Sequence, residues 1–435
     1  MYTRKFSIIP VILSLVMTVA LLLTAIGYQA VAQVAPTPTP SADDWYLTEV
    51  EEWDLPYTIP GSQSGDATWS VKAPRFESHY PRGFTFSVEV ASSAADVELA
   101  SVIWSHTPNR LQRLETRDID PDTGTIEITW RPDESLPPWV AVNFYWSLVD
   151  SAGNRYATNW ILNNEYADVQ AGWTRVESQD VVIFLQEGVP EEAIDLTVDA
   201  MATQRATFEQ AWGGALSYKP RVVLFENQRD FQEWRLGFGG SSVIGQTSQE
   251  WGATVQVLND GDVVDLAYGT VLHEIGHLYQ FEFAPDAFDA GSWLTEGNAT
   301  LFELHQQYDY EARIRNIAEA GRLPVLLQGS GPFAASPGPD GIGRYGYDVG
   351  YTFWKWLVVN FGLDAHRAVI ERLAAGTPRN VVFQQVTGLS QDEIERQWAT
   401  WLGASGPAPT LVPTWTLPAF PATSTPFQFN TPAAE

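Results

Sequence analysis

Cysteine is absent from this sequence of 435 residues. Its absence excludes disulfide bonds, cysteine-ligated zinc, iron–sulfur clusters and a catalytic thiol. Positive charge is scarce, because 25 Lys and Arg are outnumbered by 53 Asp and Glu and the formal net charge is −28. Such a surface repels the phosphate backbone of nucleic acids, so we expect no nucleic-acid partner. Histidine is also rare, at six residues, so a pair of histidines at metal-ligand spacing is informative.

The length and the apolar content predict a multidomain protein. A chain of this length exceeds one ordinary hydrophobic core, and the 45% hydrophobic content excludes a wholly disordered chain. From shifts in composition we predict a β-sandwich domain over residues 45–170 and a second domain over 171–402. A Pro/Thr linker over 34–44 precedes them, and a disordered Pro/Thr-rich tail over 403–435 follows.

The N-terminal 33 residues have the pattern of an export signal. Arg4 and Lys5 precede an uncharged, apolar stretch over residues 6–26, and Ala30-Val31-Ala32 matches an A-x-A cleavage site. The stretch is also about as long as the roughly 20 residues that span a bilayer. We therefore expect an exported protein, with segment 1–33 retained as a membrane anchor or cleaved as a signal peptide, and with the later residues outside the membrane.

The first domain is expected to be all-β. Apolar and polar residues alternate with the period of a strand in four segments, which turn sequences separate. The four segments are 84–90, 97–104, 125–130 and 140–146. About seven short strands at this spacing are typical of an immunoglobulin- or fibronectin-like sandwich. Nine of the 18 Trp residues lie between Trp45 and Trp173. They form either a packed core, which we favour, or a glycan-binding surface.

The second domain is expected to be α+β. Three apolar runs predict the strands of a small sheet, at 181–185, 221–225 and 253–258. Helical periodicity predicts helices at 191–212, 263–281, 293–320, 347–361, 364–375 and 390–402. A small sheet followed by helices is an α+β arrangement.

The sequence His273-Glu274-Ile275-Gly276-His277 is an H-E-x-x-H motif. On a helix, positions i and i+4 lie on one face, so the side chains of His273 and His277 can bind one metal ion. Glu274 lies beside the pair, where its carboxylate can accept a proton from a metal-bound water. The alternative is a helix whose histidines are only buried or solvated.

A third ligand is expected, because a catalytic zinc site has three protein ligands and one open position. Glu296, in W-L-x-E-G-x-A, begins a second helix after 18 intervening residues. With H-E-x-x-H, this pattern resembles the gluzincin metallopeptidases, and the segment 175–402 resembles their bacterial peptidase MA-like members, related to the aminopeptidase N family. The resemblance implies a thermolysin-like zinc peptidase domain, Glu296 as third ligand of one zinc ion per chain, and Glu303 as a supporting glutamate on the same helix.

The sequence from Tyr347 to Tyr351 resembles the Y-x-x-G-Y helix of the same family. The family tyrosine stabilises the oxyanion of the tetrahedral intermediate, so the resemblance assigns this catalytic role to Tyr347. A phenol O–H directed at a developing negative charge is a suitable donor. Tyr345 and Tyr351 are alternatives, and all three residues could instead be packing aromatics.

The sequence also departs from the aminopeptidase N pattern. The G-A-M-E-N loop, which captures the free amine of a substrate, has no counterpart at 251–255, so the resemblance does not extend to aminopeptidase specificity. Asn298 replaces the apolar residue that usually follows E-G. By family analogy the strand 253–258 borders the cleft and binds an extended peptide. His305 and His366 have no ligand spacing and are expected at the surface or in the packing.

The sequence therefore predicts an exported zinc metallopeptidase that hydrolyses peptides or proteins. His273, His277 and Glu296 are its expected zinc ligands, and Glu274 is its general base. Endo- or exo-action, another divalent metal and the oligomeric state stay open. The alternative function is a cell-surface adhesion or glycan-binding protein, in which the Trp-rich sandwich binds the partner and the zinc is structural.

Overall fold

The computed structural model of the protein describes six stretches of the chain. These are residues 59–107, 111–132, 135–234, 243–258, 261–285 and 291–405. The predicted export segment 1–33, the linker 34–44 and residues 406–435 of the predicted tail lie outside them. Within the six stretches, none of the helices reaches the length and apolarity of a bilayer span. All described residues belong to one compact unit, Pro40–Glu435.

The first part of the described chain is β-rich, as predicted. Its strands are β1 (Gln63–Ser64), β2 (Trp69–Ser78), β3 (Phe84–Ser92), β4 (Val97–Ser105), β5 (Gln112–Thr116), β6 (Thr125–Trp130), β7 (Ala141–Asp150), β8 (Arg155–Ala157) and β9 (Ile161–Glu165). They form two antiparallel sheets, one ordered β1-β8-β7-β4-β5 with β9 beside β7, the other ordered β2-β3-β6. The four strand segments predicted from alternation are confirmed as β3, β4, β6 and β7.

The two antiparallel sheets share one hydrophobic core, to which residues of β3, β4, β6 and β7 contribute. Trp104 and Trp146 are fully buried in this core. Trp69, Trp130 and Trp139 are half-buried against it. No tryptophan in the described stretches belongs to the exposed large hydrophobic residues, so the packing interpretation of the tryptophans is confirmed for that part of the chain.

A five-stranded mixed sheet opens the second part of the chain. Its strands are β10 (Trp173–Glu177), β11 (Val182–Gln186), β12 (Arg221–Phe225), β13 (Gly245–Thr247) and β14 (Ala253–Val257), in spatial order β10-β11-β12-β14-β13. β11, β12 and β14 are parallel, and β10 and β13 pair antiparallel at the two edges. The predicted strands at 181–185, 221–225 and 253–258 are therefore confirmed.

The two faces of this sheet enter different cores. Ile183 and Val222 pack in a core with the helices, whereas Phe184 and Val223 pack in the core of the β-rich region. Successive side chains of a strand point to opposite faces. Because both faces are covered, β11 and β12 are continuous apolar runs instead of alternating ones.

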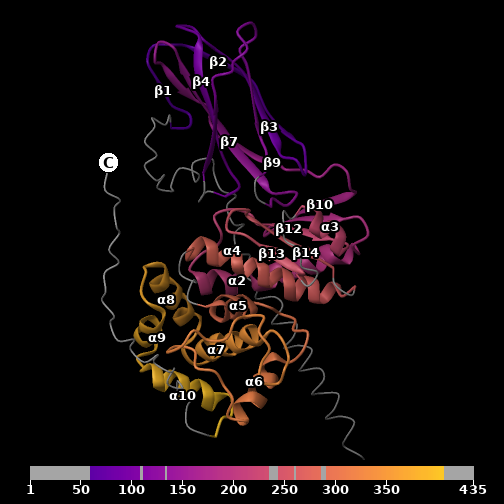
Figure 1. The fold of residues 1–435 in the computed structure, drawn as a ribbon, viewed down its shortest axis with the longest axis vertical. Helices are drawn as coiled ribbons and strands as arrows, with labels where there is room; N and C mark the ends of the chain where they lie inside the picture. The colour runs from indigo at the N-terminus through magenta and orange to yellow at the C-terminus, as the bar shows by residue number, and fades with distance from the viewer. Residues whose placement is uncertain are drawn as a thin grey trace, which may run out of the picture. The chain divides into compact units, whose positions relative to one another are not determined.

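The rest of the described chain is mainly helical. Its helices are α2 (Glu192–Trp212), α3 (Gln228–Glu233), η2 (Asp265–Val271, a π-helix), α4 (Leu272–Phe283), α5 (Ser292–Thr300), α6 (Tyr310–Glu319), α7 (Tyr345–Phe361), α8 (Leu363–Ala374), α9 (Arg379–Thr387) and α10 (Gln391–Trp401). α2 and α4 pack beside the five-stranded sheet, and the later helices follow (Figure 1). The predicted helices at 191–212, 263–281, 347–361, 364–375 and 390–402 are confirmed, with η2 as the first part of 263–281.

The predicted helix 293–320 is wrong in its middle, where the chain leaves the helix between α5 and α6. The backbone N–H groups of Leu304 and His305 donate to the carbonyl of Tyr268, at 2.8 and 3.1 Å. These bonds replace the hydrogen bonds that a continuous helix would make. The side chain of Asp309 then caps the N-terminus of α6.

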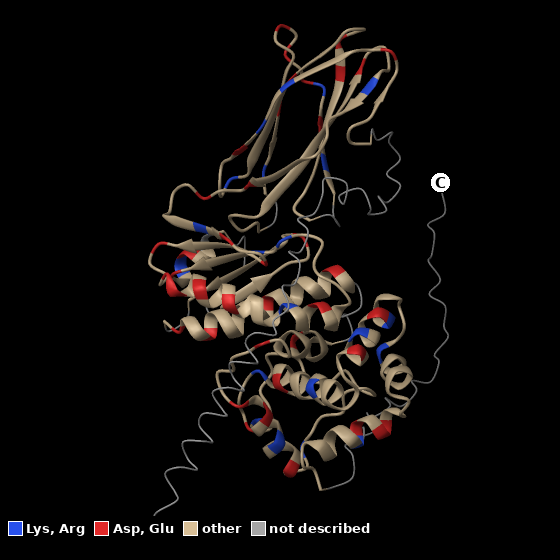
Figure 2. Cartoon of the chain, turned by 180° about the vertical axis from the view of Figure 1, so that it is seen from behind, with Lys and Arg blue, Asp and Glu red and all other residues tan. Residues whose placement is uncertain are grey.

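Acidic residues occur in every part of the described chain. Figure 2 shows Asp and Glu on the β-rich and the helical parts alike, with Lys and Arg among them. Some of these charges are paired, such as Arg205 with Asp180 and Arg313 with Asp348.

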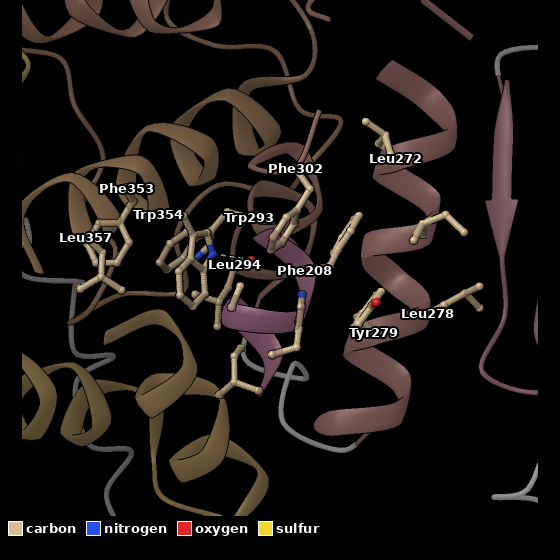
Figure 3. Packing of buried hydrophobic residues seen from close by; sticks show 14 of the residues in the cluster. Phe208, Leu272, Leu278, Tyr279, Trp293, Leu294, Phe302, Phe353, Trp354 and Leu357 are labelled. Atoms are coloured by element: carbon tan, nitrogen blue, oxygen red, sulfur yellow. Dashed lines mark hydrogen bonds between the residues drawn. The ribbon is translucent and has the colours of Figure 1, made fainter. Parts of the chain in front are cut away.

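Aromatic side chains fill the core between α2, α4, α5 and α7. The ring of Phe208 stacks on Tyr279 at 4.7 Å and on Phe302 at 4.6 Å between ring centroids (Figure 3). Trp293 meets Phe353 edge-on at 5.5 Å. Large buried rings pack closely and keep the distances between these helices fixed.

Two glycines let α5 and α7 touch through their backbones. A Cβ atom added to Gly297 in α5 would lie 2.3 Å from the backbone of Gly350 in α7. One added to Gly350 would lie 1.9 Å from the carbonyl oxygen of Trp293. Neither position can hold a side chain at this crossing. The contact therefore fixes α5, which contains Glu296, against α7, which contains Tyr347.

We predict that Gly350→Ala destabilises the fold, although alanine is the better helix former. The gain in helix propensity is about 1 kcal/mol, whereas overpacking costs about 1–3 kcal/mol or more. The clash is with backbone atoms, which cannot rotate away, so the loss should exceed the gain. The measurement is the free energy of unfolding from denaturant titration.

Gly214→Ala is the matched control for this substitution. Its added Cβ would meet only the ring of Phe283, at 3.7 Å, which is ordinary contact, so its stability should stay close to that of the wild type. A Gly350→Ala protein as stable as the wild type would show that α5 and α7 are not held in backbone contact.

Candidate metal centre

The two histidines of the H-E-x-x-H motif lie on one face of α4, as their spacing predicts. Their ring centroids are 4.9 Å apart, and both side chains are buried. The π-helix η2 runs directly into α4 and places Gly269 and Thr270 beside the same cavity as His273. Single π-helical segments are frequent at functional sites.

Glu296 of α5 completes a group of three possible ligands. Its Oε2 atom lies 3.1 Å from Nε2 of His273 and 3.3 Å from Nε2 of His277. One ligand atom from each of the three residues lies within 4.8 Å of the others, so a single ion can contact all of them. Two imidazole nitrogens and a carboxylate oxygen bind zinc at about 2.0–2.2 Å and leave a fourth position open. The residues present therefore fit a divalent metal such as zinc.

The second nitrogen of each histidine has its own partner. Nδ1 of His273 lies 3.0 Å from Oε1 of Glu303, and Nδ1 of His277 lies 2.9 Å from Oε1 of Gln280. Carboxylate and amide oxygens only accept hydrogen bonds, so each Nδ1 donates. This arrangement fixes the tautomer in which Nε2 is available as the metal ligand.

Glu303 contacts His273, but its expected position on the helix of Glu296 is wrong. α5 ends at Thr300, and the backbone N–H of Glu303 donates to the carbonyl of Thr300 at 3.2 Å, in the turn that follows. The hydrogen bonds that interrupt the predicted helix 293–320 cause this difference. The turn still brings the Glu303 carboxylate to His273, where it is largely buried.

Asn298 connects the site to the helical core. The amide nitrogen of Gln280 donates to the carbonyl of Thr295 at 2.8 Å and lies 3.4 Å from the side-chain oxygen of Asn298. The amide nitrogen of Asn298 donates to Nε2 of His366 at 2.7 Å, and Nδ1 of His366 donates to a backbone carbonyl of α2 at 2.9 Å. Burial lowers the pKa of His366 to about 4, so this packing histidine is neutral. A polar residue at position 298 is therefore explained by a buried chain of hydrogen bonds that begins at His277.

Glu274 is held by the edge strand β13. Its Oε2 atom accepts a 2.6 Å hydrogen bond from the hydroxyl of Thr247. A Cβ added at Gly245 would lie 2.6 Å from Oε1 of Glu274, so β13 passes in direct contact with the carboxylate. Glu274 is buried and is not part of the three-ligand group. Its position beside the ligands is the one that a general base requires.

Of the three candidate tyrosines, Tyr347 borders the ligand group. Its ring centroid lies 5.7 Å from that of His273. The hydroxyl of Tyr345 instead points to a backbone carbonyl at 3.4 Å, and that of Tyr351 accepts from a lysine at 3.0 Å. Burial and the nearby carboxylate of Glu296 raise the pKa of Tyr347 well above its ordinary value. Its hydroxyl is therefore protonated and can donate at neutral pH.

A cavity of about 520 Å³ opens beside the group. Residues from β13, η2, α4, the turn after α5 and the start of α7 line it, among them Gly245, His273, Glu274, Glu303, Arg344 and Tyr347. Binding sites for small molecules measure about 300–1,000 Å³. The cavity is therefore large enough for several residues of a peptide beside the possible metal ligands.

The expectation that strand 253–258 borders this cleft is wrong. β14 is internal to the sheet, because it pairs with β12 on one side and with β13 on the other. Its backbone groups are already hydrogen-bonded, so it cannot accept a peptide as a further strand. The strand that lines the cavity is β13, through Gly245.

The carboxylates around the histidines determine how strongly protons compete with a metal ion. Burial alone would lower the pKa of His273, but its hydrogen bonds to Glu296 and Glu303 outweigh burial and raise that pKa to about 10. Burial opposes a raised pKa at His277 too, and Glu296 again outweighs it. The two histidines in turn lower the pKa of Glu296 despite its burial. Because a ligand imidazole must be neutral, a metal ion has to displace a proton here.

No protein-family model matches the chain, and no curated protein sequence matches it. Among solved structures, leukotriene A4 hydrolase from Saccharomyces cerevisiae is similar with 10% sequence identity and a TM-score of 0.32, over 77% of this chain and 68% of that one. The yeast enzyme in complex with bestatin gives 10% identity and a TM-score of 0.31, over 76% and 66%. A polysaccharide deacetylase from Bacillus cereus gives 10% identity and a TM-score of 0.17, over 40% of this chain and 58% of its own. At these TM-scores the likeness establishes neither a family nor an activity.

Three residues of the site escaped the sequence analysis. Thr247 of β13 binds Glu274, and Arg344, just before α7, lines the cavity. Their distance in sequence from the motif gave no signal. Gln280 did have a signal, since it lies three residues after His277 on the same helix and thus on a neighbouring position of its face.

We predict that zinc binding releases protons and strengthens as the pH rises. His273, with a pKa of about 10, is protonated at pH 7 and must become neutral to act as a ligand. Below that pKa, each pH unit should raise the apparent affinity about tenfold per displaced proton. Isothermal titration calorimetry between pH 6 and 8, in buffers of different ionisation enthalpy, measures both effects.

His277→Ala should lose high-affinity binding together with the proton release, whereas Glu319→Gln, at an exposed glutamate of α6, should behave as the wild type. Zinc affinity that is independent of pH, with no proton release, would contradict the assigned ligand group.

Proposed function

We propose that the protein is a zinc-dependent metallopeptidase of the gluzincin type, with a peptidase MA-like domain over 171–402. The observation that supports this most directly is the convergence of His273, His277 and Glu296 on one point, with Glu274 beside them. Hydrolysis by such an enzyme requires three protein ligands, an adjacent general base and room for the substrate. The cavity next to the group meets the last requirement.

The proton transfers of peptide hydrolysis are assigned to Glu274. A zinc ion held by His273, His277 and Glu296 would polarise the scissile carbonyl and lower the pKa of the attacking water toward about 7. Glu274 takes a proton from the attacking water at Oε1, because Oε2 already accepts the hydrogen bond from Thr247. The same carboxyl group then gives this proton to the nitrogen of the leaving peptide, which breaks the C–N bond and restores the carboxylate.

The stabilisation of the negative charge in the tetrahedral intermediate is assigned to Tyr347. As water attacks, charge develops on the oxygen of the scissile carbonyl, and a preorganised donor lowers the energy of that state. The raised pKa of Tyr347 keeps its hydroxyl protonated, and its ring already lies against His273. Both features support Tyr347 as the donor to the developing oxyanion.

The edge strand β13 is the proposed binding surface for an extended peptide. Within the described stretches it pairs on one side only, with β14. A peptide that adds to its free side as a further strand would pass the cavity at Gly245, next to Glu274. Backbone hydrogen bonds would then hold the substrate, and the cavity would select its side chains.

We further propose an immunoglobulin- or fibronectin-like class for the β-rich domain 45–170, as a spacer or binding module. Segment 1–33 supports export of the enzyme, which is anchored in the membrane or secreted. The acidic composition supports the absence of a nucleic-acid partner. We propose peptides or proteins as the substrates and one zinc ion per chain. The adhesion alternative lacks support in the described stretches, because their tryptophans are packed.

We predict that Glu274→Gln retains zinc and folding but loses nearly all turnover. Glutamine keeps the size of the side chain and can still accept from Thr247, yet it cannot take a proton from water. General acid–base assistance contributes about 10²–10⁴-fold to the rate. A peptide-library digest by the purified, zinc-loaded full chain, read by mass spectrometry, measures turnover and also the cleavage pattern.

Two results would contradict the role of Glu274. Loss of zinc in Glu274→Gln would make Glu274 a ligand or a structural group. Retention of wild-type turnover would place the peptidase activity elsewhere. If the wild type itself cleaves no peptide, the proposed function is wrong and the metal group is structural.

Tyr347→Phe removes only one hydroxyl and tests the oxyanion role. We predict a decrease of kcat by about 10²–10³, because one donor to the oxyanion is lost, with unchanged zinc content. Tyr345→Phe is the matched control and should keep the wild-type kcat, since its hydroxyl points to a backbone carbonyl elsewhere. If both variants have the same kcat, Tyr347 does not stabilise the oxyanion and only packs against its neighbours.

A further inference from the structure

Arg344 stands immediately before α7 in a backbone conformation that few residues adopt. Its φ is +62°, in the left-handed region where a residue other than glycine is strained. The side chain lines the same cavity as His273, Glu274 and Tyr347. Strain of this kind is frequent at ligand sites, and here it places an arginine at the possible metal centre.

The guanidinium of Arg344 lies against two aromatic rings and has no hydrogen bond to a described residue. Its central carbon lies 4.5 Å from the ring centroid of Tyr347 and 5.2 Å from that of Tyr310. Nε and Nη2 are buried without a hydrogen-bond partner, and Arg344 forms no ion pair with a described residue. By contrast, Arg313 pairs with two aspartates, one of them Asp348. Ring faces attract a cation but satisfy none of its N–H donors.

The charges around Arg344 restrict what it can bind. Among the described residues that line the cavity, Arg344 is the only lysine or arginine, whereas Asp265, Glu274 and Glu303 are acidic. The arginine requires an anionic acceptor, and the three carboxylates oppose any ligand with more than one negative charge. A singly charged carboxylate fits this balance better than a phosphate.

We propose that Arg344 binds a carboxylate of the peptide substrate and thereby determines specificity for acidic peptides. This inference rests on the proposed peptidase function. The planar guanidinium matches a carboxylate in two parallel N–H···O bonds. Nε and Nη2 are its buried nitrogens without a partner, so we expect the carboxylate along the edge formed by Nη1 and Nη2, where it would supply a partner for Nη2. Such binding would satisfy donors that no described residue satisfies.

The geometry limits where this carboxylate lies in the substrate. The distances from the ring of Tyr347 to the ring of His273 and to the guanidinium of Arg344 are 5.7 and 4.5 Å. Arg344 is therefore within about 10 Å of His273, which is the length of roughly three extended residues. The carboxylate is either the C-terminus or an Asp or Glu side chain within about three positions of the scissile bond.

The test uses matched peptides that differ only in this carboxylate. One arm compares a free C-terminus with a C-terminal amide, at one to three residues beyond the scissile bond. The other arm compares Glu with Gln at each of the three positions on either side, in peptides that are amidated. Kinetics with the zinc-loaded full chain give kcat and KM for each pair, and the arm that responds identifies the source of the carboxylate.

Three variants assign the effect to the guanidinium. In the wild type we expect the carboxylate to improve kcat/KM by about 10–100-fold, mainly through KM, as for other charge-assisted hydrogen bonds. Arg344→Gln should abolish this preference, and Arg344→Lys, which keeps the charge without the fork, should retain part of it. Arg367→Gln, at a partly exposed arginine of α8, should leave the preference unchanged.

The ratio between paired peptides distinguishes binding from a structural role. A structural defect in Arg344→Gln would slow both members of a pair alike and leave their ratio intact, which would overturn the proposal. So would a wild type that cleaves both members equally, while the peptidase function would stand. Binding of the same pairs to Glu274→Gln, by fluorescence anisotropy, separates the two claims. If the wild type cleaves nothing but Glu274→Gln prefers the carboxylate through Arg344, carboxylate binding by Arg344 stands and the peptidase function fails.

Discussion

The contact between the backbones of α5 and α7 is the constraint on which the candidate site depends. Gly297 and Gly350 remove the side chains that would separate the two helices. Gly276 in α4 makes a second close approach, since a Cβ atom added to it would lie 3.1 Å from the Cα atom of Ala299 in α5. The glycines in the motif positions are thus explained by packing, because each permits a helix crossing.

The crossings bring the histidines of α4, Glu296 of α5 and the start of α7 to one cavity. Since buried interiors adjust little, a shift at either crossing is transmitted to the distances between the ligands.

The imidazoles of the candidate site are oriented by polar partners on both ring nitrogens. The histidines use Nδ1 for Glu303 and Gln280 and direct Nε2 to Glu296. The same carboxylates that orient the imidazoles also raise the pKa of His273, so orientation and proton competition have one electrostatic origin. Arg344 differs from them, because its Nε and Nη2 are buried without a hydrogen-bond partner among the described residues. An unsatisfied charge next to a possible metal centre is expected where a ligand supplies the missing partner.

The sequence predicted the parts of the site that depend on local spacing. His273 and His277 follow from helical geometry, and Glu296 and Tyr347 from motif resemblance. The regular elements with strong apolar periodicity, such as α2 and β12, were also predicted.

The errors have non-local causes. Hydrogen bonds to the carbonyl of Tyr268 end α5 early. β13 pairs with β14 at the sheet edge, so β14 does not border the cleft. Helix α9 was missed because only Val382 and Phe383 are buried in it, too few for a periodic pattern. Thr247 and Arg344 were missed because tertiary packing alone places Thr247 at Glu274 and Arg344 at the cavity.

The most direct test of the account is anomalous X-ray diffraction at the zinc absorption edge, from crystals of the full chain grown with zinc. The account predicts one anomalous peak per chain, at about 2.0–2.2 Å from Nε2 of His273, Nε2 of His277 and a carboxylate oxygen of Glu296. Glu274 should lie outside the coordination sphere and keep its hydrogen bond to Thr247. Three results would contradict the assigned site: a peak at another position, coordination by Glu274 in place of Glu296, or no peak although zinc is present in excess.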